Sequence, residues 1–133
     1  MTIRILIVDD RAVVRKELRH VLDLTETIAV VGEAQDGWEA VRQAEALRPD
    51  IVLMDLEMPG LDGFEATRQI KVRRLAATVI VFTVYCDEEN QRLAREAGAD
   101  AFIAKGTDLH TLLNVFEQFS GQPPGQPESE ADV

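Results

Sequence analysis

Acidic, hydroxyl and amine side chains follow or end four short apolar segments of this sequence. Asp9 and Asp10 come directly after the first such segment and Asp55 after a second, while Thr83 ends a third and Lys105 follows the last. Carboxylates bind hard divalent cations, and a carboxylate can also accept a phosphoryl group as a nucleophile. A hydroxyl and an amine nearby would bind phosphate oxygens and offset the charge that develops during transfer. These residue types therefore indicate metal-assisted phosphoryl-transfer chemistry.

Three carboxylates gathered in one place would repel one another unless a cation lay between them. At about 4 Å and an effective dielectric constant near 20, each like-charge pair costs on the order of 4 kcal/mol. A divalent cation removes this cost, and an all-oxygen site with few protein ligands suits Mg²⁺, which keeps several of its water ligands. We therefore predict a Mg²⁺ site at Asp9, Asp10 and Asp55.

Five short apolar segments are the predicted strands that position these side chains. They are nearly continuous in their apolar character and most are rich in Val and Ile, which is typical of parallel strands covered on both faces. They span residues 3–8, 28–31, 51–54, 79–82 and 101–104. Helical spacing follows each of them, over residues 14–22, 38–47, 64–72, 88–97 and 109–116. This alternation predicts an α/β fold of the flavodoxin-like (βα)5 type, a three-layer sandwich with a parallel sheet of order 2-1-3-4-5.

The predicted sheet brings the polar strand ends together. The carboxyl ends of parallel strands lie at one edge, and neighbouring strands are about 4.8 Å apart, so Asp55 is expected to face Asp9 and Asp10. Thr83 would lie on the other side of Asp55. Lys105 would lie two strand spacings away, roughly 10 Å, which its long side chain could span.

Composition limits the number of domains and the classes of partner. The 133 residues suit one domain, and the 46% of apolar residues suffice for a core. The net charge of −10 argues against direct binding to nucleic acid or to an anionic membrane surface. The apolar runs are much shorter than the roughly 18 residues of a membrane span, and a single cysteine excludes an internal disulfide. We expect a cytoplasmic protein.

Four stretches of the sequence resemble the receiver domain of two-component response regulators. They are Ile5 to Asp10, Asp55 to Gly63, Val81 to Thr83, and Gly98 to Lys105. The resemblance covers residues 2–119 and implies that Asp55 becomes a 4-aspartylphosphate, with the phosphoryl group taken from the phosphohistidine of a sensor histidine kinase or phosphotransfer protein. It also implies that Asp10 and Asp55 bind Mg²⁺ directly, Asp9 mainly through water, and Glu57 through its backbone carbonyl.

The same resemblance implies a signalling role rather than an enzymatic one. Thr83 would hydrogen-bond to a phosphoryl oxygen and Lys105 would pair with the phosphoryl group. Thr83 and the aromatic Phe102 would form a switch that alters the surface of the fourth helix, fifth strand and fifth helix to control an output. The domain would catalyse only its own phosphorylation and dephosphorylation, and the resemblance also admits a homodimer.

Three features depart from the commonest pattern of that family. Val84 stands where a smaller residue is usual, and we expect its bulk to narrow the access to Asp55. Glu57 and Tyr85 occupy positions that influence the lifetime of the aspartyl phosphate in this family. Gly106 follows the lysine where many relatives have a proline after a cis bond, an ending that leans toward regulators with a helix-turn-helix output.

Two other functions compete with this interpretation. A pseudo-receiver that only docks to partners would be marked by a missing acid or lysine, and none of these is missing. A Mg²⁺-dependent phosphohydrolase that uses an aspartyl phosphate is less favoured, because such enzymes place the nucleophile on the first strand and carry a cap domain.

Residues 1–120 are predicted to form the receiver domain. Residues 121–133 hold three of the five prolines and three acids, which predicts a flexible tail of a stand-alone receiver or a linker to an output domain.

Overall fold

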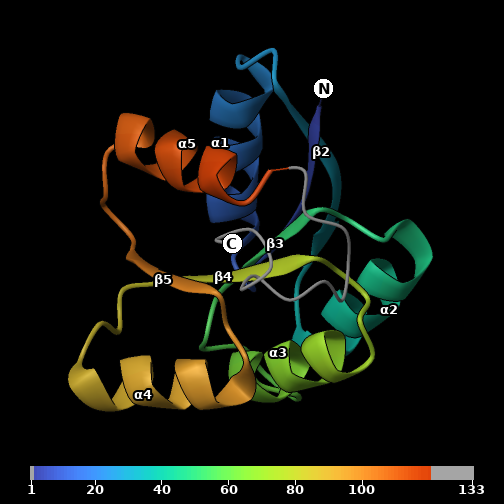
Figure 1. Ribbon diagram of the computed structural model, residues 1–133, viewed down its shortest axis with the longest axis vertical. Helices are drawn as coiled ribbons and strands as arrows, with labels where there is room; N and C mark the ends of the chain where they lie inside the picture. The colour runs from blue at the N-terminus through green and yellow to red at the C-terminus, as the bar shows by residue number, and fades with distance from the viewer. Residues whose placement is uncertain (1, 121–133) are drawn as a thin grey trace, which may run out of the picture.

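The computed structural model describes residues 2–120, which form a central sheet between two layers of helices (Figure 1). The strands are β1 (Ile3–Val8), β2 (Ile28–Ala34), β3 (Ile51–Met54), β4 (Thr78–Thr83) and β5 (Ala101–Ala104). The helices are α1 (Ala12–Asp23), α2 (Gly37–Leu47), α3 (Gly63–Val72), α4 (Glu88–Ala97) and α5 (Leu109–Gln118). The prediction about residues 121–133 lies outside the described residues.

The five strands are parallel and lie in the order β2-β1-β3-β4-β5, which confirms the predicted topology. Helices α1 and α5 cover one face of the sheet, and α2, α3 and α4 cover the other (Figure 1). The order reverses between β1 and β3, and ligands of such sheets bind at this point, beyond the carboxyl ends of the strands. The pairing of β1 with β2 contains one irregularity, between Ile5 and Leu6.

The two faces of each strand explain why the strands are apolar throughout. On β1, Ile3, Ile5 and Ile7 pack into the core beneath α1 and α5, while Leu6 and Val8 pack into the core beneath α2 and α3. Successive side chains of a strand point to opposite faces, so a strand covered on both sides needs apolar residues at every position. The continuous pattern that predicted a parallel sheet thus follows from double burial.

The predicted helix boundaries hold to within two residues. Asp62 and Asp87 each accept a hydrogen bond from a backbone N–H at the start of a helix, from Glu65 and Asn90 respectively, as expected for N-caps. Gly98 ends α4 in the left-handed conformation with φ of 103°. Strand β2 is longer than predicted, because Gly32, Glu33 and Ala34 continue the pairing with β1.

Two further features of residues 2–120 bear on the sequence predictions. All the described peptide bonds are trans, including the one that precedes Gly106. None of the described helices combines the length and the apolar character that crossing a membrane requires.

Candidate phosphoacceptor and metal site

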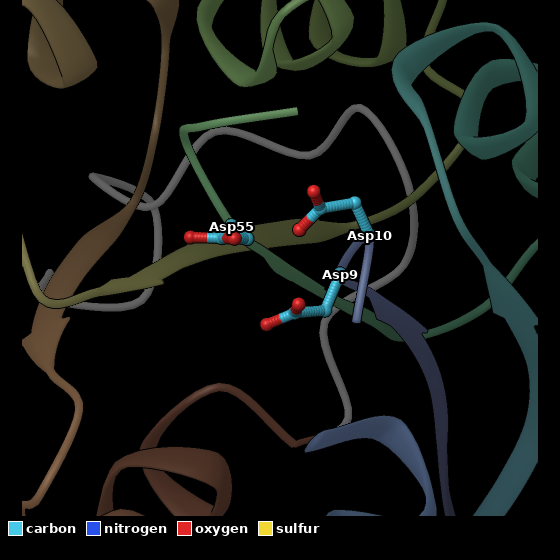
Figure 2. Close-up of side chains that lie close together, drawn as sticks. All are labelled: Asp9, Asp10 and Asp55. Carbon is cyan, nitrogen blue, oxygen red and sulfur yellow. The ribbon is translucent and has the colours of Figure 1, made fainter. Parts of the chain in front are cut away.

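Three aspartates from two neighbouring strands meet at the carboxyl edge of the sheet. Asp9 and Asp10 follow β1 and Asp55 follows β3, and the three side chains extend to the same side of these strand ends (Figure 2). One carboxylate oxygen from each lies within 4.8 Å of the others. Asp9 and Asp55 are buried, with exposed fractions of 2% and 6%, whereas Asp10 is exposed. The register of β1 with β3 produces this meeting, since Val8 pairs with Met54 directly before the acids.

Lys105 enters the cluster from the end of β5 and neutralises part of its charge. Its Nζ lies 2.5 Å from Oδ2 of Asp9 and 3.6 Å from Oδ2 of Asp55. The sequence predicted that this side chain spans the gap from β5, and the structure shows that it reaches the acids themselves. Burial raises the pKa of the Asp55 carboxyl above its ordinary value; Lys105 opposes this effect, and the charge of Asp9 adds to it. A cation at the site would therefore favour the ionised form of Asp55.

Several hydrogen bonds hold Asp9 in place. Its Oδ1 accepts a hydrogen bond from the backbone N–H of Arg11 at 2.9 Å, and its backbone carbonyl accepts one from the Arg15 guanidinium at 2.6 Å. The same guanidinium donates from Nε to Glu33 on β2 at 3.0 Å, and Arg19 donates to the other oxygen of Glu33 at 2.8 Å. Although burial raises the pKa of Glu33, the hydrogen bonds from Arg19 and Arg15 bring it below its ordinary value. Glu33 is thus a charged anchor for the arginine that supports Asp9.

The donor set suits Mg²⁺. Two oxygens on opposite sides of an octahedral Mg²⁺ lie about 4.2 Å apart, because each Mg–O bond is about 2.1 Å. At most one pair of three ligand oxygens can lie on opposite sides of the ion, and adjacent ones lie only about 3 Å apart. The three carboxylate oxygens, all within 4.8 Å of one another, would therefore have to move closer together or bind partly through water. The exposed position of Asp10 leaves room for the water ligands that Mg²⁺ retains. Asp9, Asp10 and Asp55 are therefore suited to hold this ion.

Thr83 ends β4 beside β3, and its hydroxyl is fully buried. Its Oγ1 accepts a hydrogen bond from the backbone N–H of Tyr85 at 3.2 Å, which leaves the hydroxyl proton available to donate. The Tyr85 hydroxyl donates to Oε1 of Glu57 at 3.0 Å, and this hydrogen bond raises the pKa of the tyrosine above its ordinary value of 10.0. Tyr85 thus links the loop after β4 to the loop after β3.

A pocket of about 190 Å³ opens above Asp55. Its lining residues are Asp10, Arg11, Asp55, Glu57, Val84, Tyr85 and Lys105. Val84, one of these lining residues, is exposed, and its effect on access to Asp55 stays a prediction. Phe102 on β5 is half-buried and packs against the small core of Leu56, Val81 and Ala94, where β5 approaches α4.

Sequence reasoning placed the acids, Thr83 and Lys105 at one edge, and it missed three supporting contacts. The hydrogen bonds of Arg11 and Arg15 to Asp9 could not be predicted from the sequence, because they depend on residues of other elements or on loop geometry. The Glu57–Tyr85 hydrogen bond had a partial signal, since each residue lies two positions after a candidate site residue. Its existence required the distance between two loops, which spacing along the chain does not contain.

Comparison with known proteins agrees with the geometry. The family model of the response regulator receiver domain matches residues 5–117. The transcriptional regulatory protein LiaR of Bacillus subtilis (strain 168) is 38% identical over 131 residues, which is 98% of this chain and 61% of LiaR. This chain spans little more than half the length of the curated relatives it matches.

Solved structures show the same fold. The response regulator domain of Thermotoga maritima CheB superposes with a TM-score of 0.83 at 35% identity, covering 92% of this chain and all of that domain. The receiver domain of the sensor histidine kinase PA1611 from Pseudomonas aeruginosa PAO1 gives a TM-score of 0.79 at 29% identity, with 92% of this chain and 100% of that one covered. In that structure a magnesium ion is coordinated in the active-site cleft.

Proposed function

Because this chain belongs to the response regulator receiver family, we propose that Asp55 accepts a phosphoryl group from the phosphohistidine of a sensor histidine kinase or phosphotransfer protein. The observation that carries the proposal is a buried carboxylate at the floor of an open pocket, with two further carboxylates and a lysine ammonium beside it. The domain is a signalling switch that modifies only itself.

The transfer uses the two oxygens of Asp55 differently. Oδ1 accepts a hydrogen bond from the Leu56 N–H at 2.9 Å, and Oδ2 faces Lys105 at 3.6 Å. One carboxylate oxygen forms a bond to phosphorus while the P–N bond of phosphohistidine breaks, and the imidazole leaves with the electron pair. Lys105 pairs with the phosphoryl group and the Thr83 hydroxyl donates to one of its oxygens, so that both offset its charge.

The metal would be held by Asp10 and Asp55 directly, by Asp9 mainly through water, and by the backbone carbonyl of Glu57. When bound, Mg²⁺ supplies positive charge that offsets the repulsion between the acids and the incoming phosphoryl group. Lys105 is already shared between Asp9 and Asp55, and the only other nearby cation among the described pocket residues is Arg11, 3.8 Å from Asp9, so three carboxylates face two cationic side chains. This deficit of positive charge supports the requirement for the ion.

The switch follows from the position of Thr83. When its hydroxyl turns toward the phosphoryl group, its hydrogen bond from the Tyr85 N–H is strained or lost. The loop between β4 and α4 then moves, and Phe102 repacks where β5 meets α4. The surface of α4, β5 and α5 changes as a result, and this surface controls the output.

Incubation with acetyl phosphate and Mg²⁺, followed by intact-mass measurement, tests the proposal. We expect the addition of one phosphoryl group, and none to Asp55→Asn or to wild type with EDTA. Glu26→Gln, which removes an exposed acid from the loop between α1 and β2, should still be modified. An unmodified wild type would indicate a docking pseudo-receiver instead. Repeated hydrolysis of small phosphomonoesters would indicate a phosphohydrolase.

A further inference from the structure

Two cations line the pocket above Asp55, and they differ in what they contact. Lys105 lies inside, with its ammonium engaged by Asp9 and Asp55. Arg11 lies at the mouth, with a side chain that is 58% exposed. The pocket and the acids around it carry more negative than positive charge, since Asp9, Asp10, Asp55 and Glu57 outnumber these two cations. Without Mg²⁺ an anionic phosphodonor would therefore be repelled, and positive side chains at the pocket add to the ion in drawing the donor in.

The backbone of Arg11 is held by a hydrogen bond, whereas its guanidinium has only a long ion-pair contact. Its N–H donates to Oδ1 of Asp9 at 2.9 Å, and the residue is the extended N-cap of α1, with φ of −99° and ψ of 115°. The nearest acidic oxygen to its Nε is the same Oδ1 at 3.8 Å, which is too long for a hydrogen bond. Among the contacts of residues 2–120, its guanidinium donates no hydrogen bond, whereas Arg15 and Arg19 on the same helix both donate to Glu33.

A guanidinium held only by this long ion-pair contact can bind a phosphoryl group. Its planar fork donates two parallel hydrogen bonds to phosphate oxygens, and its charge persists at every physiological pH. The fixed backbone keeps the side chain over the same pocket that contains the nucleophile. The side chain has no internal hydrogen bond to give up when a ligand arrives.

We infer that Arg11 is a donor-binding residue, which captures small acyl phosphates at the mouth of the pocket and presents their phosphorus to Asp55. The inference rests on the proposed function, because it names a further residue that binds the phosphodonor of the same nucleophile. In the transfer, the Asp55 oxygen forms the bond to phosphorus, the bond from phosphorus to the acyl oxygen breaks, and the carboxylate of the acyl group leaves with the electron pair. Arg11 acts on donor binding rather than on bond formation, so its replacement should change the half-saturating concentration of donor and not the limiting rate.

The test measures the rate of Asp55 phosphorylation against acetyl phosphate concentration, with saturating Mg²⁺ and intact mass as the readout. Arg11→Gln should raise the half-saturating concentration about fivefold, which corresponds to one exposed ion pair, and should leave the limiting rate unchanged. Arg11→Lys keeps the positive charge but loses the planar guanidinium, so its half-saturating concentration should lie between those of wild type and Arg11→Gln. Lys16→Gln is the matched control, because it removes one exposed positive charge from α1 outside the pocket lining, and it should behave as wild type.

Distinct results separate this inference from the proposed function. A wild type that acetyl phosphate does not modify overturns both. A normally modified wild type with equal half-saturation in Arg11→Gln overturns the role of Arg11 alone. An equal rise in Lys16→Gln also overturns it, because the effect would then come from net charge. A lowered limiting rate with unchanged half-saturation would show that Arg11 acts by holding Asp9 instead.

Discussion

Replacing Asp55 by asparagine is expected to stabilise the Mg²⁺-free protein at neutral pH by about 1–2 kcal/mol. With carboxylate oxygens up to 4.8 Å apart and an effective dielectric constant near 20, the repulsion from Asp9 and from Asp10 is roughly 3.5 kcal/mol each. The attraction to Lys105 at 3.6 Å is about 4.6 kcal/mol on the same scale. The balance is unfavourable by roughly 2 kcal/mol, and water around the exposed Asp10 reduces it. Asparagine removes the charge and keeps an acceptor for the Leu56 N–H.

Urea and thermal unfolding in EDTA at pH 7 measure this difference. A gain of 1 kcal/mol should raise the melting temperature of a domain of this size by about 4 °C. Added Mg²⁺ should then make wild type more stable than Asp55→Asn. Wild type gains about 2.7 kcal/mol at a hundred times its dissociation constant, whereas the variant, which lacks a charged ligand, gains much less.

The pH dependence has a defined sign. Burial raises the folded-state pKa of Asp55 above its ordinary value of 3.8, so the folded state binds the proton more tightly than the unfolded state does. The penalty is absent at pH values below the unfolded pKa. It grows between the unfolded pKa and the raised folded pKa, and it is fully present above both. The advantage of Asp55→Asn should therefore shrink as the pH falls through that window.

Glu26→Gln serves as the control, since it removes one exposed acidic charge far from the cluster along the fold. Its stability in EDTA should match that of wild type to within about 0.5 kcal/mol. An Asp55→Asn variant that is less stable than wild type in EDTA at pH 7 would refute the reasoning. Such a result would mean that the Lys105 pairing outweighs both the repulsion and the burial.

Three further predictions test the surroundings of the site. Arg15→Met removes the hydrogen bond to the Asp9 carbonyl and should weaken Mg²⁺ binding about tenfold in calorimetric titration, whereas unchanged affinity would show that Asp9 needs no such support. Gly63→Ala would place a Cβ against a backbone carbonyl at the start of the loop after β3, so we expect the free energy of unfolding in urea to fall by about 2–3 kcal/mol. An unfolding midpoint equal to that of wild type would contradict this close approach. Tyr85 is the single tyrosine, and its ultraviolet titration should show a pKa above 10.0 that falls toward the ordinary value in Glu57→Gln; no difference between the two proteins would mean that the hydrogen bond is not formed in solution.

The fold was predictable because its determinants are local patterns. Nearly continuous apolar segments of four to six residues predict doubly covered strands, and the polar residues at their ends follow from where the backbone leaves the sheet. The alternation of strands and helices then restricts the topology, because crossover connections between parallel strands are right-handed. Strand β2 was predicted too short, since Gly32 and Glu33 lack the apolar character of the other segments, and β4 extends one residue further at each end, to Thr78 and Thr83.

The chemistry of the site was predictable in kind but not in its contacts. The carboxylates, the threonine and the lysine follow strand ends, and parallel strands bring those ends to one edge. The sequence does not contain the side-chain conformation by which Lys105 bridges Asp9 and Asp55. That bridge depends on the depth of the pocket and on burial, which are properties of the packed molecule.

By itself, the amino-acid sequence determined the strand order and the set of groups that meet above the sheet, because both depend on residue type and on position relative to strand ends. Only the tertiary structure decided which charged side chains near the site form hydrogen bonds to a partner of opposite charge. Arg15 is hydrogen-bonded to Glu33 on another element, while Arg11, four residues earlier, lines the pocket with only a 3.8 Å ion-pair contact to Asp9 and no guanidinium hydrogen bond within residues 2–120. Nothing in the sequence around the two arginines predicts this difference. They differ because only folding sets the distance from each of them to an acid on a separate strand.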